Sequence, residues 1–478
     1  MAGSRFVKIG RGIRVVFREF RSGEIFSLVK RMNRSMGNRK IINVYRSFTL
    51  PDTVAGIVRL ETKRYRSNYV PFKGENLIQD INGLKVKECS HLEPMPDGSL
   101  AGAIGVEDTG QVLVKADTVM ESIEGMRIRE VYDFFVLPSL LIAGNLETRS
   151  FYDKPDEGIW CAFKENSLIR RIGNREVEST YIYGVWSDGT LVGTALLKDK
   201  RRVPFKGDTL LDEVCGRRIM SVSSDSLDFP PLDGHLMMEV KLEDGRHAIL
   251  KDDTLIETVQ GKRLLNLNVT PELYMLSDGS LAGTVEVEDY EVYLFKDDTL
   301  IDRIGGKRVM SPSLRVVLPG DVLAGDVALG DGRRVPFVGD ALIEEAGNRR
   351  IMRSKMLFAL PNGNPVSLVK LEDGRELLLN GNNLVESIGS RRMVGVERPI
   401  YFLPDGKLVG VARLEDGREV PFKGEALLER VRGEGVVSRS VDSPLPDDTV
   451  NGRIMLEDGR EFYFFWYEDE VYLSFPVE

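Results

Sequence analysis

The chain has 478 residues, of which 42% are hydrophobic and 29% charged, and its net charge is −9. This balance is typical of a soluble globular protein. No run of about 18 apolar residues occurs, which argues against a membrane-spanning helix. The length exceeds what one ordinary hydrophobic core supports, so the sequence predicts more than one domain or a repeat.

The first residues, MAGSRFVKIGRGIRVVF, are basic but lack an unbroken apolar stretch and a small-residue cleavage site, so we expect no secretory signal. A mitochondrial-type transit peptide is an alternative because of the arginine content, although Glu19 and Glu24 argue against it. The cysteines, Cys89, Cys161 and Cys215, lack metal-ligand spacing, and their odd number argues against a disulfide framework. We expect free thiols, a cytoplasmic location and no metal or cofactor.

Residues 1–47 carry twelve Lys or Arg against two acids, a net charge of +10, so the remaining residues carry −19. A basic segment of this kind could bind nucleic acid, an anionic surface or an acidic protein, or it could pack against the acidic remainder of its own chain. No nucleic-acid-binding motif accompanies the charge, and the segment fits a strand-like repeat unit, so the internal or protein-bound alternative is favoured. The candidate basic patch comprises Arg11, Arg14, Arg18, Arg21, Lys30, Arg31 and Arg34.

Nearly the whole chain repeats one unit of about 43 residues eleven times. Each unit is too small to bury an apolar face alone, so every copy must pack against its neighbours. One apolar position marks the copies at intervals of 42 to 49 residues, and we call it the marker position: Leu28, Phe72, Val114, Phe163, Phe205, Leu250, Phe295, Phe337, Leu379, Phe422 and Phe464.

Turn residues divide each copy into four short strands. Pro-Asp-Gly or Ser-Asp-Gly ends the first strand, Asp-Gly the second and Lys-Gly the third, as at Asp405, Asp416 and Lys423. Asp-Gly suits a tight hairpin because glycine has no Cβ and aspartate tolerates the left-handed region. Between turns the residues alternate with period two, which indicates half-buried antiparallel strands. The Leu-Leu-Glu-Arg-Val segment at 427–431 is too short between glycines for a helix.

An all-β chain of four-stranded antiparallel meanders resembles β-propeller repeat proteins. The resemblance covers almost the whole chain and concerns architecture alone, because no subfamily signature recurs. Eleven units exceed the usual number of about four to eight blades, which implies two propellers. These would comprise residues 1–222 with repeats 1–5 and residues 223–478 with repeats 6–11. One large ring or an open β-solenoid are the alternatives.

Two hairpins are lengthened at the same place, between the second and third strands. Because equivalent turns emerge on one face of a repeat structure, both loops are expected on the same side. Both combine aromatic and charged residues, which are favoured anchors at protein interfaces. The alternative is that they are tolerated surface insertions. The candidate partner-binding residues are Arg64, Tyr65, Arg66 and Tyr69 in one hairpin and Phe151, Tyr152 and Trp160 in the other.

A Gly-x-Arg step follows the fourth strand of most copies. The arginines could form a continuous anion-binding track, or they could pair with acids that precede them across the same turn, such as Glu257, Asp302, Glu344 and Glu386. Pairing is favoured, since opposite charges on a two-stranded ribbon attract. The series comprises Arg39, Arg127, Arg175, Arg218, Arg263, Arg308, Arg349 and Arg391.

Catalysis is weakly indicated. The three histidines, His91, His235 and His247, lack metal-ligand spacing, and no phosphate-binding, nucleophile-elbow or calcium-loop motif occurs. The sequence therefore predicts a non-enzymatic protein-interaction scaffold or structural subunit of a larger assembly. A carboxylate-based carbohydrate-active propeller enzyme and a nucleic-acid-binding protein are the alternatives.

Overall fold

We describe a computed structural model of the chain. Its described residues are 7–8, 13–14, 24–35, 41–50, 52–60, 68–107, 110–116, 118–149, 159–222, 234–266, 273–468 and 470–476. The chain divides into two compact units, Met1–Ile256 and Glu257–Glu478. The assignment of residues 1–222 and 223–478 to two propellers stays a prediction.

The first unit contains one helix, α1 (Glu24–Ser35), within its described residues, and many short strands. The strands are β1 (Val7–Lys8), β2 (Ile13–Arg14), β3 (Ile41–Thr49), β4 (Val54–Leu60), β5 (Asn68–Lys73), β6 (Asn76–Leu77), β7 (Asp80–Ile81), β8 (Leu84–Pro94), β9 (Leu100–Val106), β10 (Gly110–Lys115), β11 (Thr118–Met120), β12 (Ser122–Ile123), β13 (Met126–Val136), β14 (Ile142–Arg149), β15 (Ile159–Lys164), β16 (Ser167–Leu168), β17 (Arg171–Ile172), β18 (Arg175–Glu176), β19 (Ser179–Val185), β20 (Leu191–Leu196), β21 (Arg202–Lys206), β22 (Thr209–Leu210), β23 (Glu213–Val214), β24 (Arg217–Val222), β25 (Met237–Leu242), β26 (His247–Lys251) and β27 (Thr254–Ile256).

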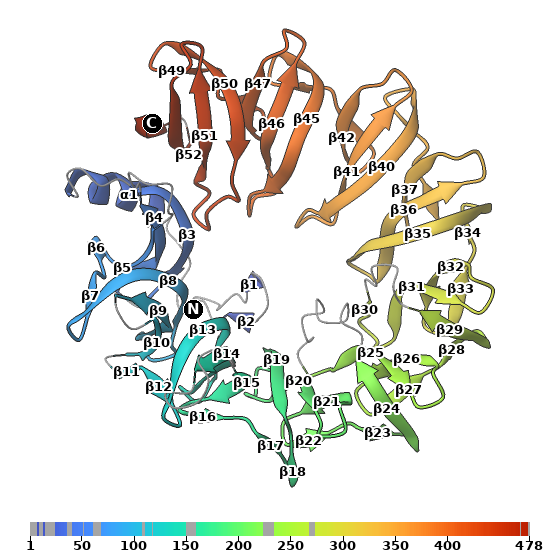
Figure 1. Cartoon of the computed structure of the whole chain (residues 1–478). Coiled ribbons are helices and arrows are strands. Elements are labelled where there is room, and N and C mark those ends of the chain that lie inside the picture. The colour runs from blue at the N-terminus through green and yellow to red at the C-terminus, as the bar shows by residue number, and fades with distance from the viewer. Residues whose placement is uncertain are drawn as a thin grey trace. The chain divides into compact units, whose positions relative to one another are not determined.

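The described residues of the second unit form strands and turns (Figure 1). The strands are β28 (Thr258–Val259), β29 (Lys262–Asn266), β30 (Tyr274–Met275), β31 (Leu281–Val287), β32 (Val292–Lys296), β33 (Thr299–Ile301), β34 (Arg303–Ile304), β35 (Lys307–Leu318), β36 (Val322–Leu329), β37 (Arg334–Val338), β38 (Ala341–Leu342), β39 (Glu345–Ala346), β40 (Arg349–Ala359), β41 (Pro365–Leu371), β42 (Glu376–Asn380), β43 (Asn383–Val385), β44 (Ser387–Ile388), β45 (Arg391–Phe402), β46 (Leu408–Leu414), β47 (Glu419–Lys423), β48 (Ala426–Leu427), β49 (Arg430–Val431), β50 (Glu434–Val441), β51 (Val450–Leu456), β52 (Glu461–Tyr467) and β53 (Glu470–Pro476).

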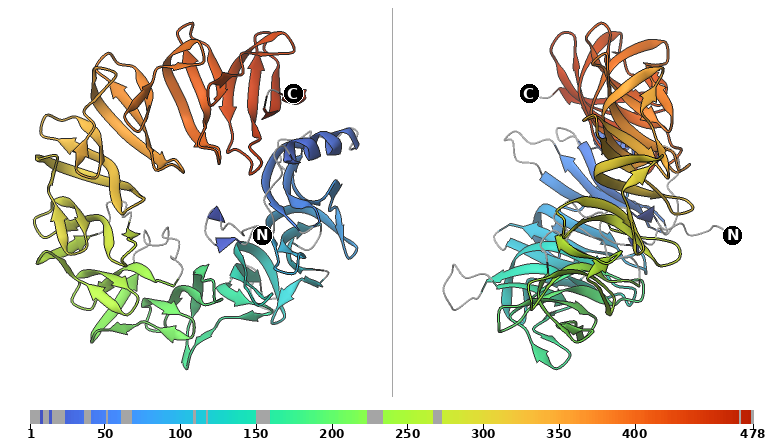
Figure 2. Two further views of the ribbon diagram at one scale, coloured as in Figure 1. Left: turned by 180° about the vertical axis from the view of Figure 1, so that it is seen from behind. Right: turned by 90° about the vertical axis from the view of Figure 1, so that its right-hand side faces the viewer.

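The recurring element is a four-stranded antiparallel meander, the blade of a β-propeller, with strands A to D in chain order. In each unit the blades follow one another in chain order, as the colour gradient of Figure 2 shows. The chain is therefore all-β with generic propeller architecture. Within the described residues we number the blades 1 (β3–β6), 2 (β8–β11), 3 (β13–β16), 4 (β19–β22), 5 (β24–β27), 6 (β29–β33), 7 (β35–β38), 8 (β40–β43), 9 (β45–β48) and 10 (β50–β53).

The marker position lies on the C strand of each of these ten blades. Its first counterpart, Leu28, lies instead in α1, so the expectation of a strand there was wrong. Ile25, Val29 and Met32 are buried together with Leu28, and a spacing of three to four residues puts them on one face of a helix. Leu28 therefore belongs to the apolar face of a helix, although its spacing from the other marker residues predicted a strand.

Each marker phenylalanine faces a glycine on the B strand. Phe337 lies directly opposite Gly325, and a Cβ built on Gly325 would lie 2.0 Å from the Ser313 carbonyl oxygen and 3.0 Å from the Phe337 ring. The B-strand glycine therefore leaves room for the A-strand carbonyl as well as for the ring, and Gly102, opposite Val114, likewise has the His91 carbonyl oxygen 2.3 Å from a built Cβ. Where the marker is Leu250 or Leu379, the opposite residue is Met238 or Ser367.

A short ladder joins consecutive blades. Ile343 donates its N–H to the Pro336 carbonyl of its own blade at 2.9 Å, and the next residue, Glu344, accepts from Ile351 N of the following blade at 2.8 Å. The Leu427–Val431 region likewise forms β48 and β49, which confirms that it is not helical. Carbonyls equivalent to that of Glu344, each bonded to the following blade, belong to Asp212, Glu257, Asp302, Glu386 and Glu429.

Neighbouring blades also share their apolar cores. In the first unit, one buried cluster runs from Leu137 in blade 3 to Leu250 in blade 5. In the second unit, another runs from Leu276 in blade 6 to Phe422 in blade 9. Within each unit, neighbouring blades therefore bury apolar faces against one another, as the repeat length requires.

Candidate partner-binding site

Of the residues predicted to bind partners, Tyr69 on β5 and Trp160 on β15 belong to the described part of the chain. Arg64, Tyr65, Arg66, Phe151 and Tyr152 lie outside the described residues. Tyr69 precedes Phe72 by three residues, and Trp160 precedes Phe163 by three, so the two occupy the same C-strand position of blades 1 and 3. At this position Tyr69 and Trp160 are the aromatic residues among the blades.

Trp160 stacks on Tyr132, with ring centroids 4.4 Å apart and an interplanar angle of 15°. Trp160 remains 52% exposed, although most large apolar side chains of the described residues are buried. One face of the indole ring is thus covered by Tyr132, and much of the remainder is open to solvent. A ring that is held by one neighbour and still exposed can bury further area on a partner with little loss of rotamer freedom.

The same arrangement occurs in blade 1, where Tyr45 contacts Tyr69 edge to face, with centroids 5.3 Å apart at 64°. Tyr45 is 58% exposed, and Tyr69 is half-buried. Both pairs join the A strand of a blade to its C strand at the base of a lengthened hairpin. Blades 1 and 3 therefore carry equivalent aromatic patches: Tyr45 and Tyr69 form the blade 1 patch, and Tyr132 and Trp160 the blade 3 patch.

Sequence reasoning missed Tyr45 and Tyr132 because both lie at β-bulges. The register of blade 1 shifts between Val44 and Arg46, which leaves Tyr45 without a cross-strand partner. The register of blade 3 shifts in the same way between Val131 and Asp133, which leaves Tyr132 without a cross-strand partner. A bulge turns its extra side chain out of the regular alternation, so period two alone could not predict where either ring lies.

Carboxylates surround the blade 3 patch. The Tyr132 hydroxyl lies 3.1 Å from Glu130 Oε2 and 3.2 Å from Glu147 Oε2. Glu147 is only 5% exposed and is paired with Arg129. Burial, followed by the hydrogen bond and charge of Glu130, holds the pKa of Tyr132 well above its usual range. The phenol is therefore neutral at physiological pH and acts as a fixed donor.

A contact from blade 2 fixes the bulge. Gln111 Oε1 accepts a hydrogen bond from Val131 N at 2.8 Å, next to Tyr132. On the other side, Asp133 accepts from the Tyr181 hydroxyl at 2.6 Å and from Asn145 Nδ2 at 3.0 Å. The patch is thus held by three neighbouring blades, which makes it preorganised for binding.

Part of the predicted basic patch pairs internally. Arg31 Nε lies 2.6 Å from Glu75 Oε1, and Lys30 Nζ lies 5.1 Å from the centre of the Phe26 ring. Arg34 is exposed in the last turn of α1. The side chain of Arg14, on β2, and the whole of Arg11, Arg18 and Arg21 lie outside the described part. The Arg31 pair agrees with the internal alternative for this residue.

Most of the Gly-x-Arg arginines in the described part of the chain pair with acids, as favoured, but not with the acids expected, and Arg39 lies outside that part. Arg349 binds Glu386 of the following turn rather than Glu344 of its own. The series also mixes two registers, because Arg349 pairs with Ala346 across its hairpin whereas Arg308 pairs with Arg303, one position further from the turn. A shift of one residue moves a side chain to the other face of the strand, so these arginines do not form one track.

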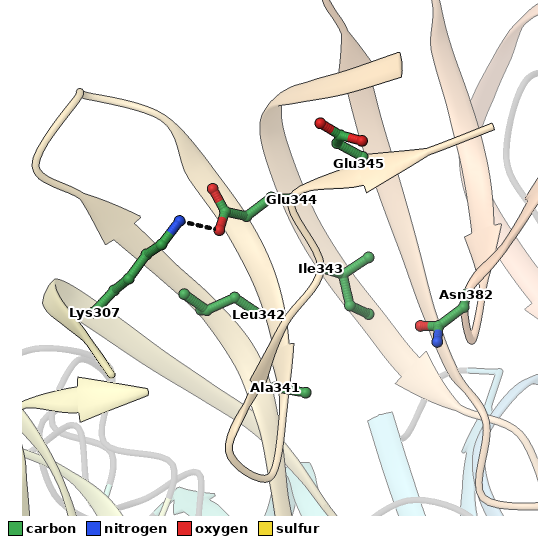
Figure 3. Close-up of a pocket in the computed structure, with 7 residues that line it drawn as sticks. All are labelled: Lys307, Ala341, Leu342, Ile343, Glu344, Glu345 and Asn382. Carbon is green, nitrogen blue, oxygen red and sulfur yellow. Dashed lines mark hydrogen bonds and ion pairs between the residues drawn. The ribbon is translucent and has the colours of Figure 1, made fainter. Parts of the chain in front are cut away.

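Two shallow grooves lie where one blade meets the next. The groove of about 600 Å³ between blades 7 and 8 is lined by the Lys307–Glu344 pair, Ile343 and Asn382 (Figure 3). The groove between blades 3 and 4 measures about 570 Å³ and combines Lys164 and Arg170 with several acids. Both grooves are lined by positively and negatively charged side chains, so neither favours a ligand of one charge.

No group of three His, Cys, Asp or Glu residues that could hold a metal ion occurs among the described residues. His235 pairs with Asp252 and His247 with Glu239. A search for membrane-spanning helices, limited to the described part of the chain, found none that is long and apolar enough.

No protein-family model matches the chain, and no curated protein matches it. Among solved structures, it is similar to BBS1N in complex with ARL6DN, with 13% identity, a TM-score of 0.23, and coverage of 60% of this chain and 90% of that one. The WD40 β-propeller domain of Doa1 gives 13% identity, a TM-score of 0.19, and coverage of 70% and 92%. A puromycin-hydrolyzing peptidase of Mycobacterium tuberculosis gives 14% identity, a TM-score of 0.23, and coverage of 60% of this chain and 50% of that one.

Proposed function

We propose that the protein is a non-enzymatic interaction scaffold of a larger assembly, and that the aromatic patches of blades 1 and 3 are its anchors for protein partners. The observation that carries the proposal is the Trp160–Tyr132 stack, whose rings are 4.4 Å apart while Trp160 stays 52% exposed. Tryptophan and tyrosine are enriched among the residues that dominate binding energy at protein interfaces.

Rigidity supports the same proposal. The inter-blade ladder at Glu344 fixes blade 7 against blade 8, and the Gln111–Val131 hydrogen bond fixes blade 2 against blade 3, before any partner arrives. A partner that docks on an ordered surface loses less conformational entropy than one that must order a loop. A binding role also needs no acid, base or nucleophile, and His235 and His247 each pair with a single carboxylate.

Affinity capture from the native source, followed by mass spectrometry, tests the proposal. The variants are Trp160→Ala and Tyr45→Ala, and Tyr290→Ala is the matched control because Tyr290 is 78% exposed and its ring contacts no other ring in the described part of the chain. Loss of an anchor of this kind costs about 2 kcal/mol or more, roughly 30-fold in affinity. We expect the same partners to be lost from both patch variants and retained by the control. Equal recovery with all three variants would contradict the proposal.

A further inference from the structure

Three cations lie close together on one face of blade 8. Arg353 on β40 lies directly opposite Lys370 on β41, and Lys355 follows Arg353 by two residues on the same strand. All three side chains are exposed, and none makes a side-chain hydrogen bond or ion pair with the described residues. Like charges that face each other across a β-ladder are destabilising, so the blade loses stability by holding Arg353 against Lys370.

The repeat itself does not require cations at these positions. In the described part of the second unit, the equivalent facing pairs of the other blades contain at most one cation each. These pairs are Asn266–Glu286, Met310–Ala328, Gly395–Arg413 and Val437–Met455. Where one copy departs from the others, a binding role is a better explanation than the scaffold.

The cations of blade 8 stand out against an acidic unit. Residues 346–371 hold five Lys or Arg and no acid, whereas residues 257–478 hold 27 Lys or Arg against 38 Asp or Glu, a net charge of −11. The acids that flank this face already have partners. Glu376, opposite Lys370, lies 3.6 Å from Arg398 of blade 9, and Glu397 pairs with Arg413. The three cations therefore remain open to a carboxylate from another molecule.

An aromatic pair continues the same face. Phe358 lies opposite Val366 on β41, and Lys355 lies opposite Leu368, two residues further along that strand. Because strand residues two apart point to the same side, Lys355 and Phe358 share one face of blade 8. Phe358 contacts Phe402 of blade 9, with ring centroids 5.0 Å apart, and Phe402 is 38% exposed. We call Arg353, Lys355, Lys370, Phe358 and Phe402 the blade 8 site.

We infer that the blade 8 site binds an acidic segment of a partner protein, with carboxylates against the three cations and an apolar side chain against Phe402. Lys355 precedes Phe358 by three residues, about 10 Å along a strand, so an acidic run with an apolar residue a few positions away matches the site. A long polyanion such as a nucleic acid would also meet the net charge of −11 on the unit, which favours a short acidic peptide. The inference goes beyond the proposed function, because the site lies in the second unit and uses neither aromatic patch.

Fluorescence anisotropy of the full chain with a fluorescein-labelled peptide, Glu-Asp-Glu-Gly-Gly-Phe, tests the inference. The wild type is expected to bind this peptide, and less tightly at higher ionic strength. Arg353→Ala with Lys370→Ala should weaken binding about fivefold or more, because two ion pairs are lost. Arg353→Lys with Lys370→Arg keeps both charges and should retain binding, which separates loss of charge from misfolding.

The control is Arg430→Ala with Arg432→Ala. Both are exposed cations of the same unit without a side-chain partner among its described residues, so this variant should bind like the wild type. Phe402→Ala should weaken binding of the peptide about threefold or more, and should not change binding of a peptide with glycine in place of phenylalanine. This difference distinguishes contact with the ring from attraction by charge alone.

An oligodeoxythymidylate of the same charge provides the comparison with nucleic acid and is expected to bind more weakly than the peptide. Absence of peptide binding by the wild type would overturn the inference, as would equal losses in the two alanine double variants or tighter binding of the oligodeoxythymidylate. Trp160→Ala should leave peptide binding unchanged, so a failure of this inference can be distinguished from a failure of the proposed function.

Discussion

Asp326 of blade 7 accepts a hydrogen bond from Met356 N of blade 8 at 2.7 Å, and Asn145 of blade 3 accepts one from Ile182 N of blade 4 at the same distance. Asp326 and Asn145 occupy equivalent positions, and both are buried. One buried polar side chain thus links two blades by the same backbone group in each unit. The repeat tolerates either an amide or a carboxylate there, so the negative charge of Asp326 is not needed for the link between the blades.

Asp326→Asn is expected to be as stable as the wild type or more stable at about pH 7. Burial raises the pKa of Asp326, so the charged form is disfavoured in the folded state. Wild-type stability relative to the variant should therefore rise as the pH falls towards about 4, since folding then favours the protonated carboxyl. Urea unfolding at both pH values measures this difference. A variant that is less stable at neutral pH and gains on acidification would contradict it.

Asp326→Ala is the companion variant. It leaves the buried Met356 N–H without its acceptor, and an unpaired buried donor costs about 1–3 kcal/mol. Relative to Asp326→Asn, we expect this loss at every pH, because neither variant has a titrating group at the position. A stability equal to that of Asp326→Asn would mean that the link between blades 7 and 8 contributes nothing.

Gly325→Ala should destabilise the second unit by about 1–3 kcal/mol, the range for overpacking a core. The added Cβ would lie 2.0 Å from a backbone oxygen, that of Ser313, which cannot move as a flexible side chain can. Gly330→Ala is the control, because a Cβ there meets nothing within 4 Å. Thermal unfolding of the two variants checks the prediction, which fails if both have the same melting temperature.

Arg333→Ala is expected to cost about 2 kcal/mol or more, because it removes a buried guanidinium that pairs with two partly exposed carboxylates. Its guanidinium lies 2.7 Å from Asp331 and 2.6 Å from Glu344, and the Arg333 side chain is 7% exposed. Arg350→Ala is the control, since Arg350 pairs with the same Asp331 but is half exposed, and such pairs contribute about 0–1 kcal/mol. Equal losses in denaturant unfolding would refute the importance ascribed to the buried arginine.

Acid should weaken the same contact. Hydrogen bonds from Lys307 and then Arg333 lower the pKa of Glu344. A carboxyl whose pKa is lowered on folding stabilises the protein above its unfolded pKa, and this stability is lost as the pH falls through the folded value. The difference between Arg333→Ala and the wild type should therefore shrink on acidification, as unfolding measured from about pH 7 to about pH 3 can show. A difference that stays constant would place the effect in packing alone.

Gln111→Ala should weaken partner capture although Gln111 is not part of either aromatic patch. The side chain holds Val131 N beside the Tyr132 bulge, so its loss frees the ring that Trp160 stacks on. Gln260→Ala is the control, because Gln260 holds Leu300 N in the same way in the second unit. Capture reduced by Gln111→Ala and not by Gln260→Ala is the expected result; the reverse would show that the bulge does not position the patch.

The blades could be predicted because their signals are local. Asp416-Gly417 and Lys423-Gly424 fix turns through backbone conformation, and the alternation around Phe422 fixes which face is buried. The A-strand bulges could not be predicted, since a bulge depends on the neighbouring strand and changes register without a turn residue. Tyr45 and Tyr132 were missed for this reason, whereas Tyr69 and Trp160 follow directly from the lengthened hairpins.

The helix α1 and the mixed arginine series show the same limit. Leu28 matches the spacing of the marker position, yet its neighbours follow the period of a helix, and only tertiary packing decides between the two. Gly306 is the second residue of its two-residue turn, whereas Gly347 is the first residue of its turn. The arginine two residues after each glycine therefore takes a different register in the two hairpins. Spacing alone therefore predicted pairing in general but not the partners.

Photo-crosslinking from position 160 tests the central claim most directly. A photoreactive phenylalanine derivative in place of Trp160 keeps a large aromatic side chain at the blade 3 patch, and the same substitution at Tyr290 is the control. The account predicts crosslinked protein adducts from position 160, in competition with the unlabelled wild-type chain, and none from position 290. Absence of adducts from position 160, or identical adducts from both positions, would contradict it.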